Sequence, residues 1–222
     1  MIRVKIFCCN PFQENSYLLY DESGEGIAVD PGFYDGEELS AFCRTVEENN
    51  ISLRGIWLTH GHFDHVYGVQ PLIDKVGALP VYMHPGDREL LSLAPKMVAI
   101  FRMKEPQTAF STLDLADGDI LEAGASRFRV ITTPGHTRGG VCFYSETDKI
   151  LLTGDTLFAG SIGRTDLPGG EYDDLIVSIM DKLMGLPGDI DLFPGHGPVS
   201  DIATERTQNP FLQPFNEPDQ EY

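Results

Sequence analysis

The first thirty residues show the pattern of hydrophobic and polar positions that is typical of β-strands. Short apolar runs occupy residues 3–8, 16–20 and 26–29, and in the first of them polar and apolar side chains alternate. Asn-Pro and Glu-Ser-Gly-Glu-Gly sequences, which favour turns, separate the runs. The pattern predicts an antiparallel meander.

Two helical patterns follow. Between residues 35 and 49, Leu39, Phe42 and Val46 recur at three- and four-residue intervals, which predicts a helix that stops near the Asn-Asn doublet. Val66, Val69, Ile73 and Val76 also share one helical face. Pro71 fits that second helix only if it lies in the first turn, where a missing N–H costs nothing.

The rest of the chain divides into further strands and one helix. Residues 94–112 show no sustained period between Pro95 and Pro106, which predicts a long loop. Strands are expected at 55–59, 80–83, 120–123, 128–132, 141–144, 150–152 and 190–193, and a helix at 172–184. Two strand-rich halves that each carry helices predict an α/β (α+β) fold, a four-layer αββα sandwich in one domain spanning 1–222.

Composition narrows the possible partners. The net charge of −18 disfavours nucleic acid and anionic membrane surfaces as partners. The chain has no apolar run long enough for a bilayer span and no signal peptide, so a cytoplasmic location is expected. The four cysteines lack a Cys-x-x-Cys pair and are interpreted as reduced, buried thiols, with Cys8 and Cys9 on opposite strand faces. The proline-rich tail, 208–222, cannot be regular helix, and either wraps the surface through Phe211 and Phe215 or frays.

Candidate chemistry is concentrated in histidines and aspartates that follow strands. Thr-His-Gly-His-Phe-Asp-His at 59–65 places three imidazoles and a carboxylate directly after an apolar strand, a crowding that packing does not explain. Three other segments repeat the order of strand, turn and one metal-competent side chain. The complete set of candidate ligands is His60, His62, Asp64, His65, His136, Asp155 and His196. Nitrogen and oxygen donors of this kind suit Zn²⁺ or Fe²⁺.

These motifs resemble the metallo-β-lactamase superfamily, and within it the glyoxalase II (hydroxyacylglutathione hydrolase) branch. The resemblance rests on the 59–65 motif, Thr-Pro-Gly-His-Thr at 133–137, Thr-Gly-Asp-Thr-Leu-Phe at 153–158, Gly-Arg-Thr-Asp at 163–166 and Pro-Gly-His-Gly at 194–197. It implies two divalent ions, with His60, His62 and His136 on one, Asp64, His65 and His196 on the other, and Asp155 bridging. Zn²⁺ is expected, and the donors also accept Fe²⁺ or Mn²⁺.

The resemblance implies a binuclear hydrolase in which a hydroxide between the metals attacks a small-molecule thioester such as S-lactoylglutathione. Asp64 would orient the attacking water. Asp30 either orients a ligand histidine or forms a simple Asp-Pro-Gly turn, and His84 is left as a surface or outer residue. Because lactam-cleaving relatives carry cysteine at the position of Asp155, β-lactams are not expected as substrates.

Substrate contacts depart from the full-length glyoxalase II pattern. The 26 residues after His196 are too few for its glutathione-binding helical domain, so the closest match is a short, single-domain glyoxalase II-like hydrolase. Arg164 aligns with a basic substrate-contacting position, or pairs with Asp166. Phe101 and Met103 either form an apolar wall over the metals or pack as surface loop.

Two alternatives remain open from the sequence. In a mononuclear iron persulfide dioxygenase, His60, His136 and Asp155 would hold the ion. The other alternative is a non-catalytic metal-binding protein.

Overall fold

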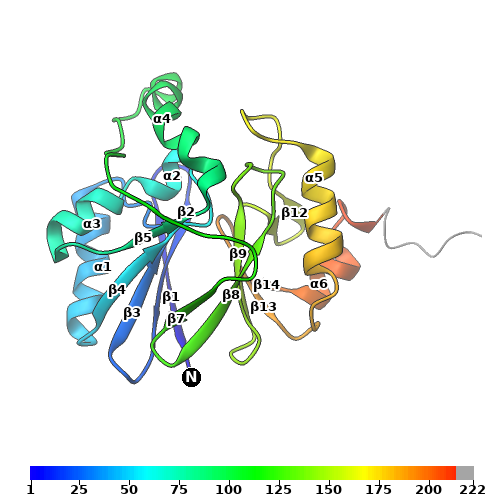
Figure 1. Cartoon of the computed structure of the whole chain (residues 1–222), viewed down its shortest axis with the longest axis horizontal. Helices are drawn as coiled ribbons and strands as arrows, with labels where there is room; N and C mark the ends of the chain where they lie inside the picture. Colours follow the sequence, from blue (N-terminus) through cyan, green and yellow to red (C-terminus); the bar gives the residue numbers. More distant parts are fainter. Residues whose placement is uncertain (214–222) are drawn as a thin grey trace, which may run out of the picture.

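Two six-stranded sheets lie face to face in the computed structural model, which describes residues 1–213 (Figure 1). The first sheet has the spatial order β1-β2-β3-β4-β5-β6, antiparallel from β1 to β3 and parallel from β3 to β6. Its strands are β1 (Arg3–Cys9), β2 (Glu14–Tyr20), β3 (Glu25–Val29), β4 (Ser52–Trp57), β5 (Val81–Met83) and β6 (Leu113–Asp114).

The second sheet has the order β14-β13-β10-β9-β8-β7 and is antiparallel except where β10 runs parallel to β13. Its strands are β7 (Ile120–Ala123), β8 (Ser126–Thr132), β9 (Val141–Ser145), β10 (Ile150–Gly154), β13 (Asp191–Pro194) and β14 (Ser200–Asp201). A short hairpin, β11 (Leu157–Phe158) and β12 (Ser161–Ile162), follows β10. The strands expected from sequence are all present, with ends displaced by a few residues.

The two sheets pack through an aromatic core. Trp57 of β4 lies between Phe128 of β8 and Phe143 of β9, with ring centroids 5.4 and 5.2 Å apart. All three side chains are buried. Because their neighbours in each strand point to the opposite face, each sheet also has an outer apolar surface that must be covered.

Helices cover both outer surfaces (Figure 1). Phe42 and Leu72, from the two helices outside the first sheet, join its apolar cluster, and Leu175 and Ile202 do the same for the second. The helices are α1 (Gly36–Glu48) and α3 (Val69–Val76) on one side, and α5 (Tyr172–Val177), its π-helical continuation η2 (Ser178–Leu183) and α6 (Ile202–Gln208) on the other. The predicted αββα sandwich is confirmed.

The segment 94–112 corrects the sequence interpretation, since its first part is helical. Helix α4 (Arg88–Phe101) contains Pro95 and packs over the short helix α2 (Phe63–Val66). An interior proline removes one helical hydrogen bond at a cost of about 3 kcal/mol. Burial of Leu91, Ala94 and Val98 on one face offsets that cost. Residues 103–112 form no regular element, as predicted.

Other expectations were partly right. The expected helix with Val66, Val69, Ile73 and Val76 on one face is interrupted: Val66 ends α2, and the other three residues lie in α3. Pro71 does lie in the first turn of α3. All four cysteines are free, and Cys9, Cys43 and Cys142 are buried as expected, but Cys8 is exposed, because Cys8 and Cys9 point to opposite faces of β1. In the tail, Phe211 is partly exposed while the adjacent Leu212 is buried. Phe215 lies outside the described residues.

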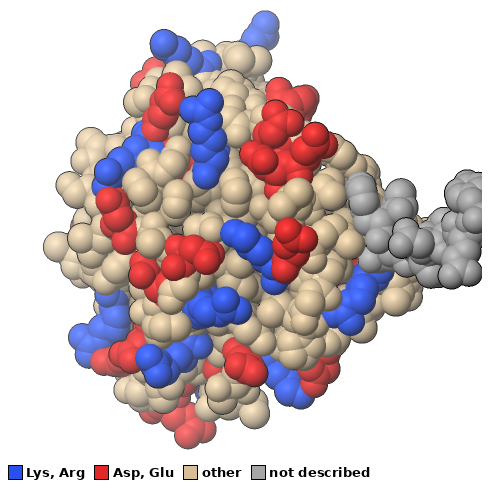
Figure 2. All heavy atoms as spheres, turned by 45° about the vertical axis from the view of Figure 1, so that its right-hand side comes forward, with Lys and Arg blue, Asp and Glu red and all other residues tan. Residues whose placement is uncertain are grey.

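Charged side chains of both signs lie on the molecular surface. On the face shown in Figure 2, the described Lys and Arg side chains are scattered among acidic and uncharged ones and form no continuous basic surface. Within residues 1–213 no helix is both long and apolar enough to cross a bilayer.

Candidate metal centre

The seven candidate ligands come from four turns that meet at one edge of the sandwich. Since β10 and β13 are parallel neighbours, the residues that follow them must lie at the same edge. The ligands are His60, His62, Asp64 and His65 after β4, His136 after β8, Asp155 after β10 and His196 after β13. The structure brings together every residue of the set expected from sequence.

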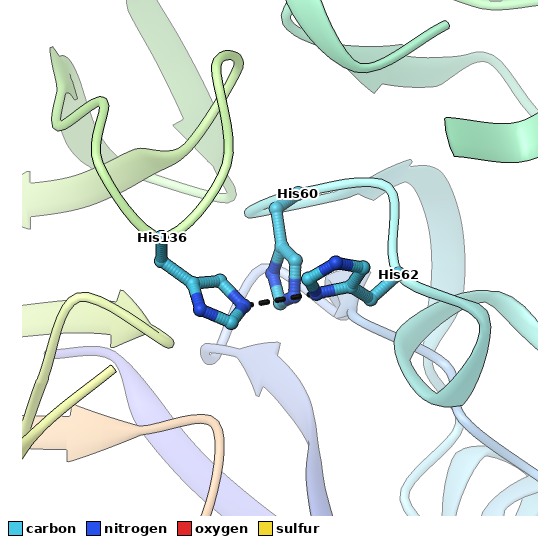
Figure 3. Close-up of side chains that lie close together, drawn as sticks. All are labelled: His60, His62 and His136. Atoms are coloured by element: carbon cyan, nitrogen blue, oxygen red, sulfur yellow. Dashed lines mark hydrogen bonds between the residues drawn. The ribbon is translucent and has the colours of Figure 1, made fainter. Parts of the chain in front are cut away.

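Three histidines form one part of the cluster, which we call the three-histidine half-site: His60, His62 and His136. Nδ1 of His62 lies 2.9 Å from Nε2 of His136 (Figure 3). The ring of His60 stands 4.9 Å, centroid to centroid, from each of the other two. Three imidazoles from two separate loops therefore point at a common position, and all three are buried.

Asp64, His65 and His196 form the second part, which we call the carboxylate half-site. Oδ2 of Asp64 lies 3.9 Å from Nε2 of His65 and 3.4 Å from Nε2 of His196. One atom of each residue falls within 4.8 Å of the others. This set is more open, because a quarter of the His196 side chain is exposed.

Asp155 stands between the two half-sites. Its Oδ1 lies 3.4 Å from Nε2 of His65, and its Oδ2 lies 3.5 Å from Nε2 of His136 and 3.6 Å from Nε2 of His196. One carboxylate thus faces histidines of both half-sites.

The hydrogen bonds of the imidazoles turn their lone pairs inward. Three of the histidines can donate their Nδ1 hydrogens to oxygen atoms outside the cluster: His65 to Oδ2 of Asp30 at 3.1 Å, His136 to the carbonyl of Arg164 at 2.7 Å and His196 to the carbonyl of Phe12 at 3.1 Å. In the neutral imidazole, the form that binds metal, such a bond fixes the tautomer and leaves Nε2 as an acceptor facing the cluster.

Several of these inward atoms lack a partner. Nε2 of His60 is buried and makes no hydrogen bond, and Nε2 of His65 and Oδ1 of Asp155, also buried, face each other at 3.4 Å without meeting hydrogen-bond geometry. Buried polar atoms without partners are costly in a folded protein, and a group of acceptors converging on one point is electrostatically unfavourable unless a cation lies among them. The donor set therefore fits divalent metal ions.

Burial and charge act differently on the imidazoles. Burial lowers the pKa of His60 well below its usual value and that of His62 to about 3, so both are neutral at pH 7, the form that binds metal. Burial would also lower the pKa of His65, but the carboxylates of Asp155 and Asp64 outweigh it and raise that pKa.

Asp30 lies behind the cluster. Its Oδ1 accepts a hydrogen bond from the N–H of Thr59 at 2.7 Å, and its Oδ2 accepts from the Thr59 hydroxyl at 2.6 Å and from His65. Although Asp30 is close enough to His60 and His65 to be a ligand itself, both of its oxygens are already engaged. Its φ of 46°, in the left-handed region that aspartate tolerates, marks a constrained turn. These contacts favour the orienting role over a simple turn.

A cleft of about 430 Å³ opens beside the candidate ligands. Phe101 of α4 is part of its wall, with its ring centroid 5.2 Å from that of Phe12 and 5.8 Å from that of Phe63. Met97 completes this apolar side. Met103 packs on the apolar cluster that includes Phe63 and is not among the residues that line the cleft. Helix α4 thus contributes an apolar wall to the cleft through Phe101, whereas Met103 is not part of this wall.

Arg164 also borders the cleft, but its guanidinium is engaged. Its Nε and Nη2 donate to the two carboxylate oxygens of Asp166 at 2.7 and 2.8 Å. Both side chains are largely exposed. Of the two roles expected for Arg164, this bidentate pair matches pairing with Asp166 and not a substrate contact.

Sequence reasoning missed two buried carboxyl groups near the cluster. Burial raises the pKa of Glu14 well above its usual value, and its Oε1 lies 3.9 Å from Nδ1 of His65. Asp87 follows β5 in the sequence Met-His-Pro-Gly-Asp. His136 and His196 likewise follow a strand and come directly after a Pro-Gly pair. That order could have identified Asp87. The neighbouring His84 accepts a hydrogen bond from the N–H of Gly86 and so caps this turn.

Comparisons with known proteins agree with this geometry. A profile of the Metallo-beta-lactamase superfamily matches residues 9–196. Hydroxyacylglutathione hydrolase GloC of Haemophilus influenzae is 33% identical in an alignment of 216 residues that covers 95% of this chain and 98% of that protein.

Two solved structures are similar over almost the whole chain. BLEG-1, described as a B3 metallo-beta-lactamase, is 34% identical with a TM-score of 0.85, over 96% of this chain and 99% of that one. TTHA1623, described in a di-iron-bound form, is 36% identical with a TM-score of 0.84, over 94% of this chain and 100% of that one. The chain belongs to the metallo-beta-lactamase superfamily.

Proposed function

We propose that the chain is a hydrolase of small-molecule thioesters, of the glyoxalase II type, that holds two divalent metal ions. The observation that carries the proposal is the convergence of nitrogen and oxygen donors on two positions, with His65, His136 and His196 oriented by Nδ1 hydrogen bonds to atoms outside the cluster and with Nε2 of His60 buried without a hydrogen bond. The similarity to GloC supports the reaction class.

The ligands divide between two ions. His60, His62 and His136 would hold one, the carboxylate half-site would hold the other, and Asp155 would be shared. When bound, divalent ions of this kind lower the pKa of coordinated water from 15.7 to about 7 and polarise a substrate carbonyl. We propose Zn²⁺ as the bound metal. Fe²⁺ is the alternative, because a similar structure is described in a di-iron-bound form.

The remaining residues would position the reactants. Asp64 lines the cleft beside His62, and its carboxylate would orient the attacking water. His65 lowers the pKa of Asp64, opposing the effect of burial, so the carboxylate stays ionised and can accept a hydrogen bond from that water. A thiolate, with a free-thiol pKa of about 8.5, can leave without prior protonation. This suits a cleft whose described lining, apart from the candidate ligands, contains no carboxyl or imidazole group.

The cleft favours an acyl group with an apolar part. Phe12, Phe63 and Phe101 stand on one side, and Arg164, a basic residue in its lining, is paired with Asp166. Glutathione carries two carboxylates, and this cleft presents no unpaired cation to them among the described lining residues. We therefore propose that glutathione is one possible carrier rather than a requirement.

Turnover of a thioester panel that includes S-lactoylglutathione tests the proposal. We expect hydrolysis that a chelator abolishes and Zn²⁺ restores, with two metal ions per chain by elemental analysis. The matched control is Asp189→Asn, which breaks an exposed ion pair with Lys149 far from the cluster and should keep both metal and activity.

Three outcomes would contradict it. Oxygen uptake with a persulfide and one iron per chain would indicate the dioxygenase. Metal binding without turnover of any thioester or lactone would indicate a non-catalytic protein. Faster hydrolysis of a cephalosporin than of every thioester would indicate a lactamase, a comparison that the similarity to BLEG-1 makes necessary.

A further inference from the structure

Asp87 is a buried charged residue to which the proposed function assigns no role. It ends the short 3₁₀ turn η1 (Pro85–Asp87) between β5 and α4, and its side chain is completely buried. Aspartate is rarely buried to this extent without specific partners. The question is which groups hold it there.

Its partners are the two loops that carry the three-histidine half-site. Oδ2 of Asp87 accepts a hydrogen bond from the N–H of Gly61 at 2.9 Å and from the hydroxyl of Thr137 at 2.8 Å, and Oδ1 accepts from the N–H of Gly139 at 2.6 Å. Gly61 lies between His60 and His62, and Thr137 follows His136. One carboxylate therefore joins the loop after β4 to the loop after β8, the two loops of Figure 3.

The sequence accommodates this close approach at two glycines. A Cβ on Gly61 would lie 2.9 Å from the carbonyl oxygen of Asp87, and a Cβ on Gly139 would lie 2.7 Å from its nitrogen. Both distances are shorter than real Cβ contacts allow. Both loops thus need glycine where they contact Asp87.

A helix-capping role does not account for the residue. Asp87 occupies the position before α4, yet its side chain makes no capping hydrogen bond to that helix. Its carboxylate is used instead by the two loops.

We propose that Asp87 is a positioning residue that fixes the distance between the His60–His62 loop and the His136 loop, so that the three-histidine half-site is formed before metal binds. Asp30 makes the corresponding contacts for the other half-site, to Thr59 and His65. The inference rests on the metal-binding part of the proposed function and is independent of the substrate. Outer groups that orient ligands typically contribute about 10–100-fold to metal affinity.

The test is Asp87→Asn, because either orientation of the amide places an NH₂ group against at least one backbone N–H. The chain offers a matched control in Asp21→Asn. Asp21 is also buried and accepts hydrogen bonds from two backbone N–H groups, of Ser23 and Ala125, and from the Ser23 hydroxyl. It directly follows β2, at the opposite end of that strand from Glu14 and the metal cluster.

Two measurements follow. In the metal-free protein, hydrogen exchange should accelerate at the Gly61 and Gly139 amides in Asp87→Asn and stay parental in Asp21→Asn. Zn²⁺ affinity, measured by competition with a chelator, should fall about 10–100-fold in Asp87→Asn and remain unchanged in the control. Thr137→Val, which removes one of the three hydrogen bonds, should give a smaller loss and serves if Asp87→Asn does not fold.

The outcomes separate this inference from the proposed function. Parental Zn²⁺ affinity in both Asp87→Asn and Thr137→Val would overturn the positioning role alone. An equal loss in Asp21→Asn would also overturn it, because the effect would then be one of general stability. A parent chain that binds no Zn²⁺ would contradict the proposed function as well.

Discussion

The two half-sites use different donors in different surroundings. His60, His62 and His136 offer only nitrogen, and all three are buried. The carboxylate half-site contains Asp64 and a partly exposed His196. Neutral ligands leave the charge of a divalent ion uncompensated in the first half-site, whereas carboxylates compensate it in the second. Asp155, which faces His136 at 3.5 Å and His65 at 3.4 Å, would supply negative charge to both ions of the proposed function.

The largest expected effect therefore comes from Asp155→Asn. The amide keeps the shape of the side chain but removes the negative charge that both half-sites share. We expect loss of at least one metal ion per chain and a fall in kcat of at least about a hundredfold, beyond the upper end of what outer ligand-orienting groups contribute. Elemental analysis and steady-state kinetics are the measurements.

Full retention of both metals and of kcat in this variant would show that Asp155 does not bridge. Because the side chain is only 11% exposed, a thermal melt should accompany the kinetics to establish that the variant folds.

The half-sites should also differ in their response to pH. With a pKa of about 3, His62 stays neutral on mild acidification, so protons do not compete with its metal. Burial opposes but does not prevent the rise in the pKa of His196 that the hydrogen bond to Asp64 and the charge of Asp155 cause. A proton therefore competes with metal at His196 from a higher pH. Although burial opposes it, Asp155 and Asp64 raise the pKa of His65 in the same half-site, so protons compete with metal at two of its ligands. As pH falls below these raised pKa values, affinity at the carboxylate half-site should fall at least about tenfold per unit.

Equilibrium dialysis against Zn²⁺ between pH 8 and 5 is the measurement. We expect the metal content to fall from two ions to one before the second is lost. Simultaneous release of both, with no step at one ion, would contradict the difference between the half-sites. His196→Ala should bind a single ion throughout and serves as the reference.

A site residue can be predicted from the sequence when the residues next to it in the chain determine its position. All seven candidate ligands could be named because each lies in the loop or short helix that follows a strand, where the sequence pattern itself shows which side chains leave the sheet. Helix α4 was missed because Pro95 interrupts the local pattern, and the burial that compensates for it comes from contacts with α2, which are tertiary.

The same distinction applies to the residues behind the ligands. Asp30 could be proposed from its Asp-Pro-Gly motif, but the choice between a turn and an orienting role needed its contact with His65, which lies 35 residues away. Asp87 bonds to residues 26 and 52 positions away. Such partners are set by how the sheets pack, which the local pattern does not encode.

A smaller effect is expected at the cleft wall. Phe101→Ser removes an aromatic ring that is about half exposed, at 47%. Since full burial of such a side chain contributes about 1.5–3 kcal/mol, half of that corresponds to a rise in KM of roughly three- to tenfold for an apolar acyl thioester, with kcat little changed. Met103→Ser is the matched comparison and should leave KM near the parental value, because Met103 does not line the cleft. Equal kinetics in the parent and Phe101→Ser would exclude the wall as a substrate contact.

The smallest effect is expected for Arg164→Ala. The guanidinium is already paired with Asp166 in an exposed setting, where such pairs contribute about 0–1 kcal/mol to stability. The contact that orients His136 uses the backbone carbonyl of Arg164, which alanine retains. We therefore expect less than about a twofold change in kcat and KM for an uncharged thioester, on the scale of that weak pair. The same variant should be assayed with S-lactoylglutathione. A large rise in KM for that substrate alone would mean that Arg164 leaves Asp166 to bind a glutathione carboxylate. Glutathione would then be the required carrier.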